Sequence, residues 1–305
     1  MMHGTWLWLR LASLPRVEDC LPHLDGVIVP LHTSRGPVHV GPTLRAWLRE
    51  WTDAGKVWWA MDWLTGTGNA HVEDLCARSL DLGAAGLMLD AERPAGWRGR
   101  VRDARDYRDA LAEHAGGLDL AVTDGAGISI GASVLGPLLA EVDGVRPIGV
   151  PQSYDPDGRY DPDYHQERVD RWRALGAQRV VVGLGLWLGG PDRHRTPEEL
   201  RRHMAGVPAD VDGVGGWYAR ASALDDHDDE TADDLLPVLG SWPGRPRDAA
   251  TRPTDPAPAE DRPTPVGAGP LERAVDELLG TAARLKPTHP EAAEEVARAA
   301  ERIAE

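Results

Sequence analysis

The stretch that decides the fold is Gly86-Leu87-Met88-Leu89-Asp90-Ala91-Glu92, a short apolar run that ends in two carboxylic acids. The apolar residues predict a buried strand. Side chains two positions apart in a strand share one face, so Asp90 and Glu92 are expected to point the same way. A buried, unpaired carboxylate is costly, so we expect both acids at a rim that solvent reaches. A buried strand ending in paired acids is typical of a barrel enzyme.

Further strands and helices alternate on both sides of this stretch. The expected strands cover residues 5–10, 26–32, 56–64, 118–124, 144–154, 179–187 and 213–219. The expected helices cover residues 17–24, 42–54, 70–82, 98–114, 133–142, 164–175, 197–204 and 230–239. Within the last-but-one helix, Thr196 and Glu199 have the spacing of a capping box. Eight strand–helix units predict parallel pairing through right-handed crossovers and closure into a (β/α)8 TIM barrel over residues 1–242.

The alternative fold is a doubly wound open sheet. That fold usually carries a glycine-rich phosphate-binding turn after its first strand, and none follows residues 5–10. The pattern therefore favours the barrel.

The composition changes at Pro243. Residues 243–270 are rich in proline and cannot build a core, so they are expected to form a semi-extended linker. Residues 271–305 carry two amphipathic stripes and predict a pair of helices. Two such helices bury too little surface to be stable alone, so we expect them to dock on the barrel, on a second copy or on a protein partner. The alternative is a helical tail with little role.

Charge and composition narrow the class of protein. The net charge is −16, with 49 acidic against 33 basic residues, which argues against nucleic acid or an anionic membrane as a partner. The N-terminal residues lack the features of a signal peptide, and no apolar run approaches the ~20 residues that cross a membrane. The chain is expected to be cytoplasmic, or exported without an N-terminal signal.

Cys20 and Cys76 lie in predicted helices and are expected to be small buried side chains rather than a disulfide.

In a TIM barrel, functional residues follow the C-terminal ends of the strands. The residues at those ends are His32, Asp62, Trp63, Asp90, Glu92, Asp124, Gln152, Tyr154, Asp155, Trp187, Trp217 and Tyr218. This set is rich in carboxylates and tryptophan and supplies no cluster of histidine and cysteine for zinc. We predict no metal and no cofactor. The alternative is a solvated divalent cation held by Asp62, Asp90 and Asp124.

Acids beside indole rings suit sugar chemistry. Tryptophan faces stack on the C–H surfaces of sugar rings, while carboxylates, tyrosine and glutamine bind hydroxyls and transfer protons. Glu92 is the best candidate for a general acid, because a neighbouring carboxylate at Asp90 would raise its affinity for a proton. The alternative is that both acids are rim residues paired with arginines.

Three segments resemble the chitinase-like glycoside hydrolase family 18. Residues 85–92, Ala-Gly-Leu-Met-Leu-Asp-Ala-Glu, resemble the D-G-x-D-x-D-x-E strand of that family, with Gly86, Asp90 and Glu92 on matching positions. Gln-Ser-Tyr-Asp at 152–155 is similar to the M-x-Y-D of the sixth strand, and Gly-Gly-Trp at 215–217 is similar to the tryptophan segment of the last strand.

This resemblance implies a substrate-assisted mechanism. Glu92 would protonate the glycosidic oxygen, and Asp90 would orient the 2-acetamido group, which acts as the nucleophile. Tyr154 and Asp155 would hold the acetamide and nearby hydroxyls, and Trp217 would form the floor of the sugar pocket. The sequence departs from the family pattern at Ala85, Met88 and Gln152, and the loss of an aspartate at 88 would weaken or abolish turnover.

The muramidases of glycoside hydrolase family 25 are a weaker match. They also carry Asp-x-Glu at a strand end, but their first strand bears an aspartate that residues 5–10 lack. Both resemblances imply an N-acetylated glycan. We therefore expect a glycosidase acting on peptidoglycan or a chitin-like polysaccharide, with Asp62, Trp63, Asp124, Gln152, Asp155, Trp187, Trp217 and Tyr218 binding the substrate. The alternative is a non-catalytic glycan-binding or structural barrel, tethered to a larger phage-like or injection-type assembly by residues 271–305.

Overall fold

The computed structural model describes residues 2–9, 14–64, 69–92, 97, 99–125, 128–155, 157–159, 161, 163–186, 195–217 and 229–243, with backbone alone at 229–233. The proposed linker and the C-terminal helix pair lie outside the described residues, apart from Pro243 itself. The same holds for Trp187 and Tyr218.

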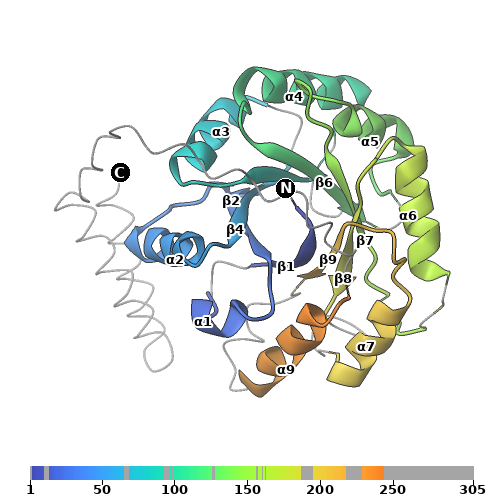
Figure 1. Ribbon diagram of the computed structural model, residues 1–305. Helices are drawn as coiled ribbons and strands as arrows, with labels where there is room; N and C mark the ends of the chain where they lie inside the picture. Colours follow the sequence, from blue (N-terminus) through green and yellow to red (C-terminus); the bar gives the residue numbers. More distant parts are fainter. Residues whose placement is uncertain are drawn as a thin grey trace, which may run out of the picture. The chain divides into compact units, whose positions relative to one another are not determined.

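Eight parallel strands close into a barrel, and helices lie around it (Figure 1). The barrel strands are β1 (Gly4–Trp8), β2 (Gly26–Thr33), β4 (Val57–Trp63), β5 (Gly86–Asp90), β6 (Asp119–Gly125), β7 (Ile148–Gln152), β8 (Val181–Gly185) and β9 (Gly213–Trp217). Each pairs with its neighbours in parallel, and β1 closes the ring by pairing with both β2 and β9. The predicted (β/α)8 TIM barrel is confirmed.

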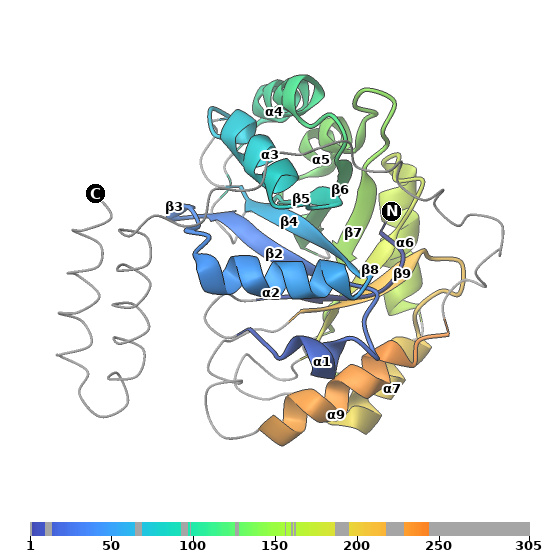
Figure 2. The same ribbon diagram turned by 60° about the vertical axis from the view of Figure 1, so that its left-hand side comes forward.

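The helices alternate with these strands, as the sequence predicts. They are α1 (Val17–Cys20), α2 (Pro42–Asp53), α3 (Val72–Asp81), α4 (Val101–His114), α5 (Ala132–Leu139), α6 (Tyr164–Ala174), α7 (Pro197–Ala205) and α9 (Asp229–Gly240). Figure 2 shows α3 to α6 on the outside of the strands from a second direction. Among the described residues, no helix is both long and apolar enough to span a membrane.

Several predicted boundaries hold and others shift. The capping box at Thr196 and Glu199 is confirmed, with both reciprocal hydrogen bonds present. The strand predicted over 144–154 is shorter, because β7 begins only after Pro147 and a separate bridge pairs Val142 with Val145. A two-residue strand that the sequence pattern did not indicate, β3 (Gly36–Pro37), pairs antiparallel with the end of β2. Cys20 and Cys76 are buried free thiols, as predicted.

Tryptophan and glycine fill the barrel interior together. Trp6, Trp8 and Trp59 belong to the buried core cluster, with the methionines and branched aliphatic side chains of neighbouring strands. Glycines face these rings: Gly26 faces Trp6, Gly86 faces Trp59 and Gly215 faces Trp8. Two of the pairs are direct register partners across adjacent strands, Trp6 with Gly26 and Trp59 with Gly86. The chain has no phenylalanine, and it fills the barrel interior by placing tryptophan rings against glycines, which have no side chain.

Replacing Gly215 with alanine is expected to destabilise the barrel by about 1–3 kcal/mol, because the added methyl group would overlap the Trp8 ring. Gly136→Ala in α5 is the matched control, since no heavy atom lies within 4 Å of a Cβ added there. It should be neutral or slightly stabilising, because alanine is the better helix former. Urea denaturation of both variants measures the difference, and equal stabilities would show that the interior repacks freely.

Candidate active site

Asp90 and Glu92 meet at the C-terminal end of the barrel. Met88 belongs to the barrel core cluster, so strand alternation places Asp90 on the same inward face, one step above it. The Asp90 side chain is buried and forms a hydrogen bond with Glu92, whose side chain is partly exposed. The sequence predicted this shared face, and the structure shows that it is the interior of the barrel; the expectation that both acids lie at a solvent-reached rim is wrong for Asp90, which is buried.

Burial and mutual proximity shift the pKa values of Asp90 and Glu92. Burial raises the pKa of Asp90 well above 3.8, and the charge of Glu92 raises it further. The pKa of Glu92 is also raised, first by burial, while the hydrogen bond from Asp90 acts in the opposite direction. The expectation that Asp90 raises the pKa of Glu92 is wrong: the hydrogen bond from Asp90 lowers it, and it is the charge of Glu92 that raises the pKa of Asp90. With both pKa values raised, the pair is expected to retain a proton to higher pH than an isolated carboxylic acid does.

Strand β7 adds an amide and a phenol to the site. Ile148 and Val150 belong to the core cluster, so Gln152 continues the inward face, and its Nε2 lies 3.5 Å from Asp90 Oδ1. Tyr154 follows, and its Cβ would lie only 3.0 Å from a Cβ built on Gly185 of β8. Burial and the neighbouring acids Glu92 and Asp90 raise the pKa of Tyr154 well above 10, so its hydroxyl stays protonated and can donate a hydrogen bond.

Two indole rings stand at the ends of other barrel strands. Trp63 is the register partner of Asp90 on β4, and its Nε1 has no hydrogen-bond partner within the described part of the chain. Trp217 ends β9 and packs edge-on against Trp8, with ring centroids 6.3 Å apart. Both rings are partly exposed. They can offer an apolar face to a ligand in the barrel mouth.

Two other predicted site residues, Asp124 and Asp155, form side-chain hydrogen bonds to the backbone of the loops that follow their strands. Asp124 is buried and accepts hydrogen bonds from the backbone N–H groups of Gly125 and Ile130 and from the hydroxyl of Ser129, so it organises the turn that follows β6. Burial raises its pKa to about 6 despite these bonds. Asp155 has a left-handed backbone, with φ of 40°, and its side chain accepts from the backbone N–H of Arg159.

Asp62 lies on the opposite side of its strand from the barrel interior. Met61 belongs to the core cluster, and Asp62 turns towards α3 and α4 instead. Its oxygens lie 2.8 Å from His32 Nδ1 and 2.8 Å from His71 Nε2, and Tyr107 donates its hydroxyl to the same carboxylate. The three bonds to histidine and tyrosine hold the pKa of Asp62 below 3.8 although burial opposes them. Asp62 thus forms a buried cluster of its own rather than a wall of the barrel mouth.

The side chains of this cluster, two imidazoles and a carboxylate, are of the kinds that bind transition metals. The ring geometry fits hydrogen bonds better. His32 and His71 stack with centroids 4.0 Å apart and an interplanar angle of 13°. Lone pairs in two parallel ring planes do not converge on one ion, whereas each ring reaches a different oxygen of Asp62. The arrangement is therefore best described as one carboxylate bound by three donors, within the part of the chain that the structure describes.

The stability of the fold should fall as pH rises through the titration of His71. The hydrogen bond to Asp62 raises the pKa of His71 above 6.5. A raised pKa means that the contribution is complete below pH 6.5 and is lost as pH passes the folded value. The imidazole is partly exposed, so we expect a loss of at most about 1 kcal/mol. Urea denaturation between pH 6 and 9 measures it, and His71→Gln, which cannot titrate, should remove the dependence. A dependence unchanged in that variant would assign it to other groups.

Sequence reasoning missed three residues that shape these sites. His71 and Tyr107 lie in or beside helices, where a single polar residue gives no signal of a partner. Arg195 is fully buried and donates to the backbone carbonyls of Tyr154, Asp155 and Gly185, so it fixes the segment after β7. A charged residue that follows a strand gives no indication of burial before its carbonyl partners are known.

Comparison with known proteins supports the architecture. No family model and no curated protein matches the sequence. Among solved structures, a family 18 chitinase from the chitin utilization locus of Flavobacterium johnsoniae is similar with a TM-score of 0.52 and 12% identity, over 78% of this chain and 93% of the chitinase. A xylanase-alpha-amylase inhibitor protein, solved in complex with trehalose, is similar with a TM-score of 0.51 and 11% identity, over 79% of this chain and 99% of the inhibitor. At these identities the similarity shows the barrel fold.

Proposed function

We propose that this chain is a glycoside hydrolase that acts on a polysaccharide containing N-acetylhexosamine, such as peptidoglycan or a chitin-like polymer. The observation that carries the proposal is the hydrogen-bonded pair of Asp90 and Glu92 at the C-terminal end of the barrel, in which the pKa values of both acids are raised. Gln152 and Tyr154 lie beside it and supply polar contacts for a sugar.

Each residue takes a role that its environment supports. Glu92 is the more exposed acid of the pair; it takes the proton that Asp90 holds and passes it to the glycosidic oxygen as the bond to the anomeric carbon breaks, which leaves Asp90 as a carboxylate. The 2-acetamido oxygen of the substrate then attacks that carbon, and Asp90 orients the acetamide and stabilises its positive charge. Tyr154 donates its hydroxyl to the acetamide, and Trp217 lies under the sugar ring. These last roles rest on the resemblance to glycoside hydrolase family 18.

The second candidate function is non-catalytic binding of a glycan, with residues 271–305 as a tether to a larger assembly. The observation that favours it is Met88, which is fully buried among the core side chains directly below Asp90. A carboxylate at this position could share the proton of Asp90, whereas a thioether cannot accept it with comparable strength. The barrel could then bind N-acetylated sugar without cleaving it.

One experiment separates the two candidates. The purified chain is incubated with peptidoglycan and with chitin oligosaccharides, and reducing ends and tryptophan fluorescence are measured in parallel. Release of reducing sugar would support the hydrolase. Saturable fluorescence change without release would support the binding barrel, because Trp63 and Trp217 lie at the proposed site. If a folded barrel gave neither release of reducing sugar nor a fluorescence change, both candidates would be contradicted.

A further inference from the structure

The junction between β7 and β8 is the part of the barrel that carries Tyr154. β8 pairs with β9 along its whole length, whereas β7 and β8 pair at Gln152 with Gly183 and at one isolated bridge near their starts. Ser153 N still donates to the carbonyl of Gly183, at 2.7 Å. Tyr154 and Asp155 follow, beyond the end of β7. Their position therefore depends on contacts other than a continuous β-ladder.

Arg195 supplies such contacts from the end of β8. Its backbone N–H donates to the carbonyl of Leu186, directly after β8, at 3.0 Å. Its side chain is fully buried, and Nε donates to the carbonyl of Gly185 at 2.9 Å. Nη2 donates to the carbonyls of Tyr154, at 2.7 Å, and Asp155, at 2.6 Å. A planar guanidinium has its donors in fixed directions, so it holds the three carbonyls in one arrangement.

Gly185 lets the end of β8 approach Tyr154 closely. A Cβ built at this glycine would lie 3.0 Å from the Cβ of Tyr154 and 3.1 Å from its carbonyl oxygen. A side chain at Gly185 would therefore push the backbone of Tyr154 away. The absent side chain and the guanidinium of Arg195 thus set the position of the same residue.

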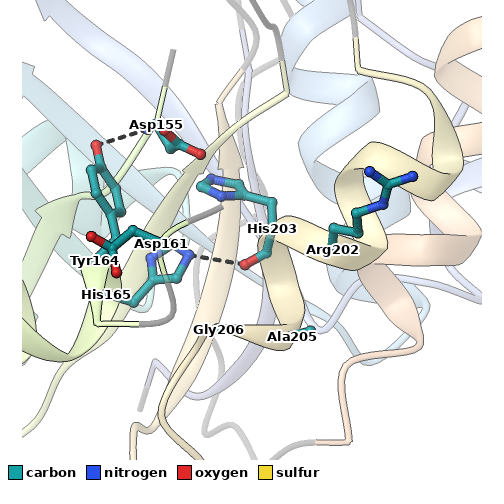
Figure 3. Close-up of a pocket in the computed structure, with 8 residues that line it drawn as sticks. All are labelled: Asp155, Asp161, Tyr164, His165, Arg202, His203, Ala205 and Gly206. Atoms are coloured by element: carbon teal, nitrogen blue, oxygen red, sulfur yellow. Dashed lines mark hydrogen bonds between the residues drawn. The ribbon is translucent and has the colours of Figure 1, made fainter. Parts of the chain in front are cut away.

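Asp155 depends on hydrogen bonds for its position. It lines a cavity of about 180 Å³ between α6 and α7, so part of its surroundings is open space rather than packed side chains (Figure 3). Its backbone is left-handed, with φ of 40°, a conformation that non-glycine residues adopt at a cost. Its N–H donates to the hydroxyl of Tyr164, at 2.9 Å, and its carbonyl accepts from Arg195. These two bonds hold the strained residue from opposite ends of its peptide units.

We propose that Arg195 is a positioning residue for Tyr154, and that its guanidinium holds this backbone so that the phenol lies beside Asp90 and Glu92. The charges of both acids act on the phenol, which places its hydroxyl near them. The inference rests on the proposed function, in which that hydroxyl binds the acetamide of the substrate. Arg195 is fully buried, so it acts through Tyr154 and touches no substrate itself.

The first test needs no substrate. The full chain is produced with 3-fluorotyrosine, and Tyr154→Phe identifies the fluorine signal of Tyr154 by its disappearance. We expect Arg195→Met to shift or broaden this signal. Arg195→Lys should do so to a smaller extent, because an ammonium offers one nitrogen where the guanidinium uses two. Tyr107, in the Asp62 cluster, should keep its signal and serves as the internal reference.

An unchanged Tyr154 signal in the folded Arg195 variants would overturn the proposal. Arg195→Lys keeps the charge and most of the length of the side chain, so it decides the question if Arg195→Met does not fold.

Arg179→Met is the matched control. Arg179 also donates to a backbone carbonyl, that of Met2 at 2.6 Å, and it pairs with Asp212 at 3.3 Å. It precedes β8, so it lies at the opposite end of the strand from Arg195. Its replacement should lower stability but leave the Tyr154 signal in place. A shift of that signal as large as in Arg195→Met would indicate general loosening of the barrel and would also overturn the proposal.

The second test uses hydrolysis of chitin oligosaccharides and of peptidoglycan. Arg195→Lys should lower kcat by about ten- to a hundredfold, because a displaced hydroxyl no longer holds the acetamide in line for attack. In the Tyr154→Phe background the same substitution should change kcat by less than about twofold, because the hydroxyl that Arg195 positions is already absent. Equal losses in both backgrounds would contradict action through Tyr154.

The two tests fail separately. If the wild type releases no sugar, the proposed function fails, whereas the fluorine signals still show whether Arg195 sets the position of Tyr154. If the wild type is active and Arg195→Lys leaves both kcat and the Tyr154 signal unchanged, the hydrolase stands and the positioning role is lost.

Discussion

Replacing Glu92 with glutamine is expected to lower the rate of glycan hydrolysis by at least about a hundredfold, the usual contribution of a positioned general acid. The amide keeps the shape of the side chain and can still accept a hydrogen bond from Asp90, but it has no proton to give to the leaving oxygen. Because the pKa values of Asp90 and Glu92 are raised, wild-type activity should persist to higher pH than an ordinary carboxylic acid allows and decline as the pair loses its proton.

The measurement is the release of reducing ends across a pH series by the wild type and the variant. Glu113→Gln is the matched control, since Glu113 is an exposed residue on α4, and its activity should equal that of the wild type. Substrate binding by Glu92→Gln should be retained, which separates loss of chemistry from loss of affinity. Full activity in Glu92→Gln would remove this residue from the role of acid, even if the barrel proved to be a hydrolase.

Replacing Asp62 with asparagine is expected to lower the free energy of unfolding by about 3 kcal/mol, the typical cost of removing one partner of a buried ion pair. The Asp62 side chain is fully buried and receives hydrogen bonds from His32, His71 and Tyr107. An amide can accept at only one of its two terminal atoms, so at least one of these donors would lose its partner. The cluster joins β2 and β4 to the start of α3 and to α4, so its loss should loosen that side of the barrel.

Urea denaturation of the variant at neutral pH tests this expectation. Asp74→Asn is a suitable control, because Asp74 is an exposed carboxylate on α3 that lies 3.6 Å from Arg78. Surface pairs of this kind contribute about 0–1 kcal/mol. If the two variants lost equal stability, the buried cluster would contribute no more than a surface pair.

The sequence determined the barrel because the evidence for it is local and repeated. Short apolar runs alternate with segments of helical spacing along residues 1–242, and each unit carries its own boundary signals, such as the capping box at Thr196 and Glu199. The shared face of Asp90 and Glu92 is equally local, since it follows from the two-residue period of a strand.

Tertiary structure alone decided which face of each strand looks into the barrel. The strands of a parallel barrel are buried on both faces, so β4, with Trp58 and Trp59 buried on opposite sides, carries no pattern that tells inside from outside. This is why Asp62, expected among the substrate-binding residues, instead faces the helices, while Asp90 faces the interior. The partners of Asp62 also come from distant parts of the chain. His71 and Tyr107 meet it only when α3 and α4 pack against the strands, because that packing, and no local preference, brings the three side chains together.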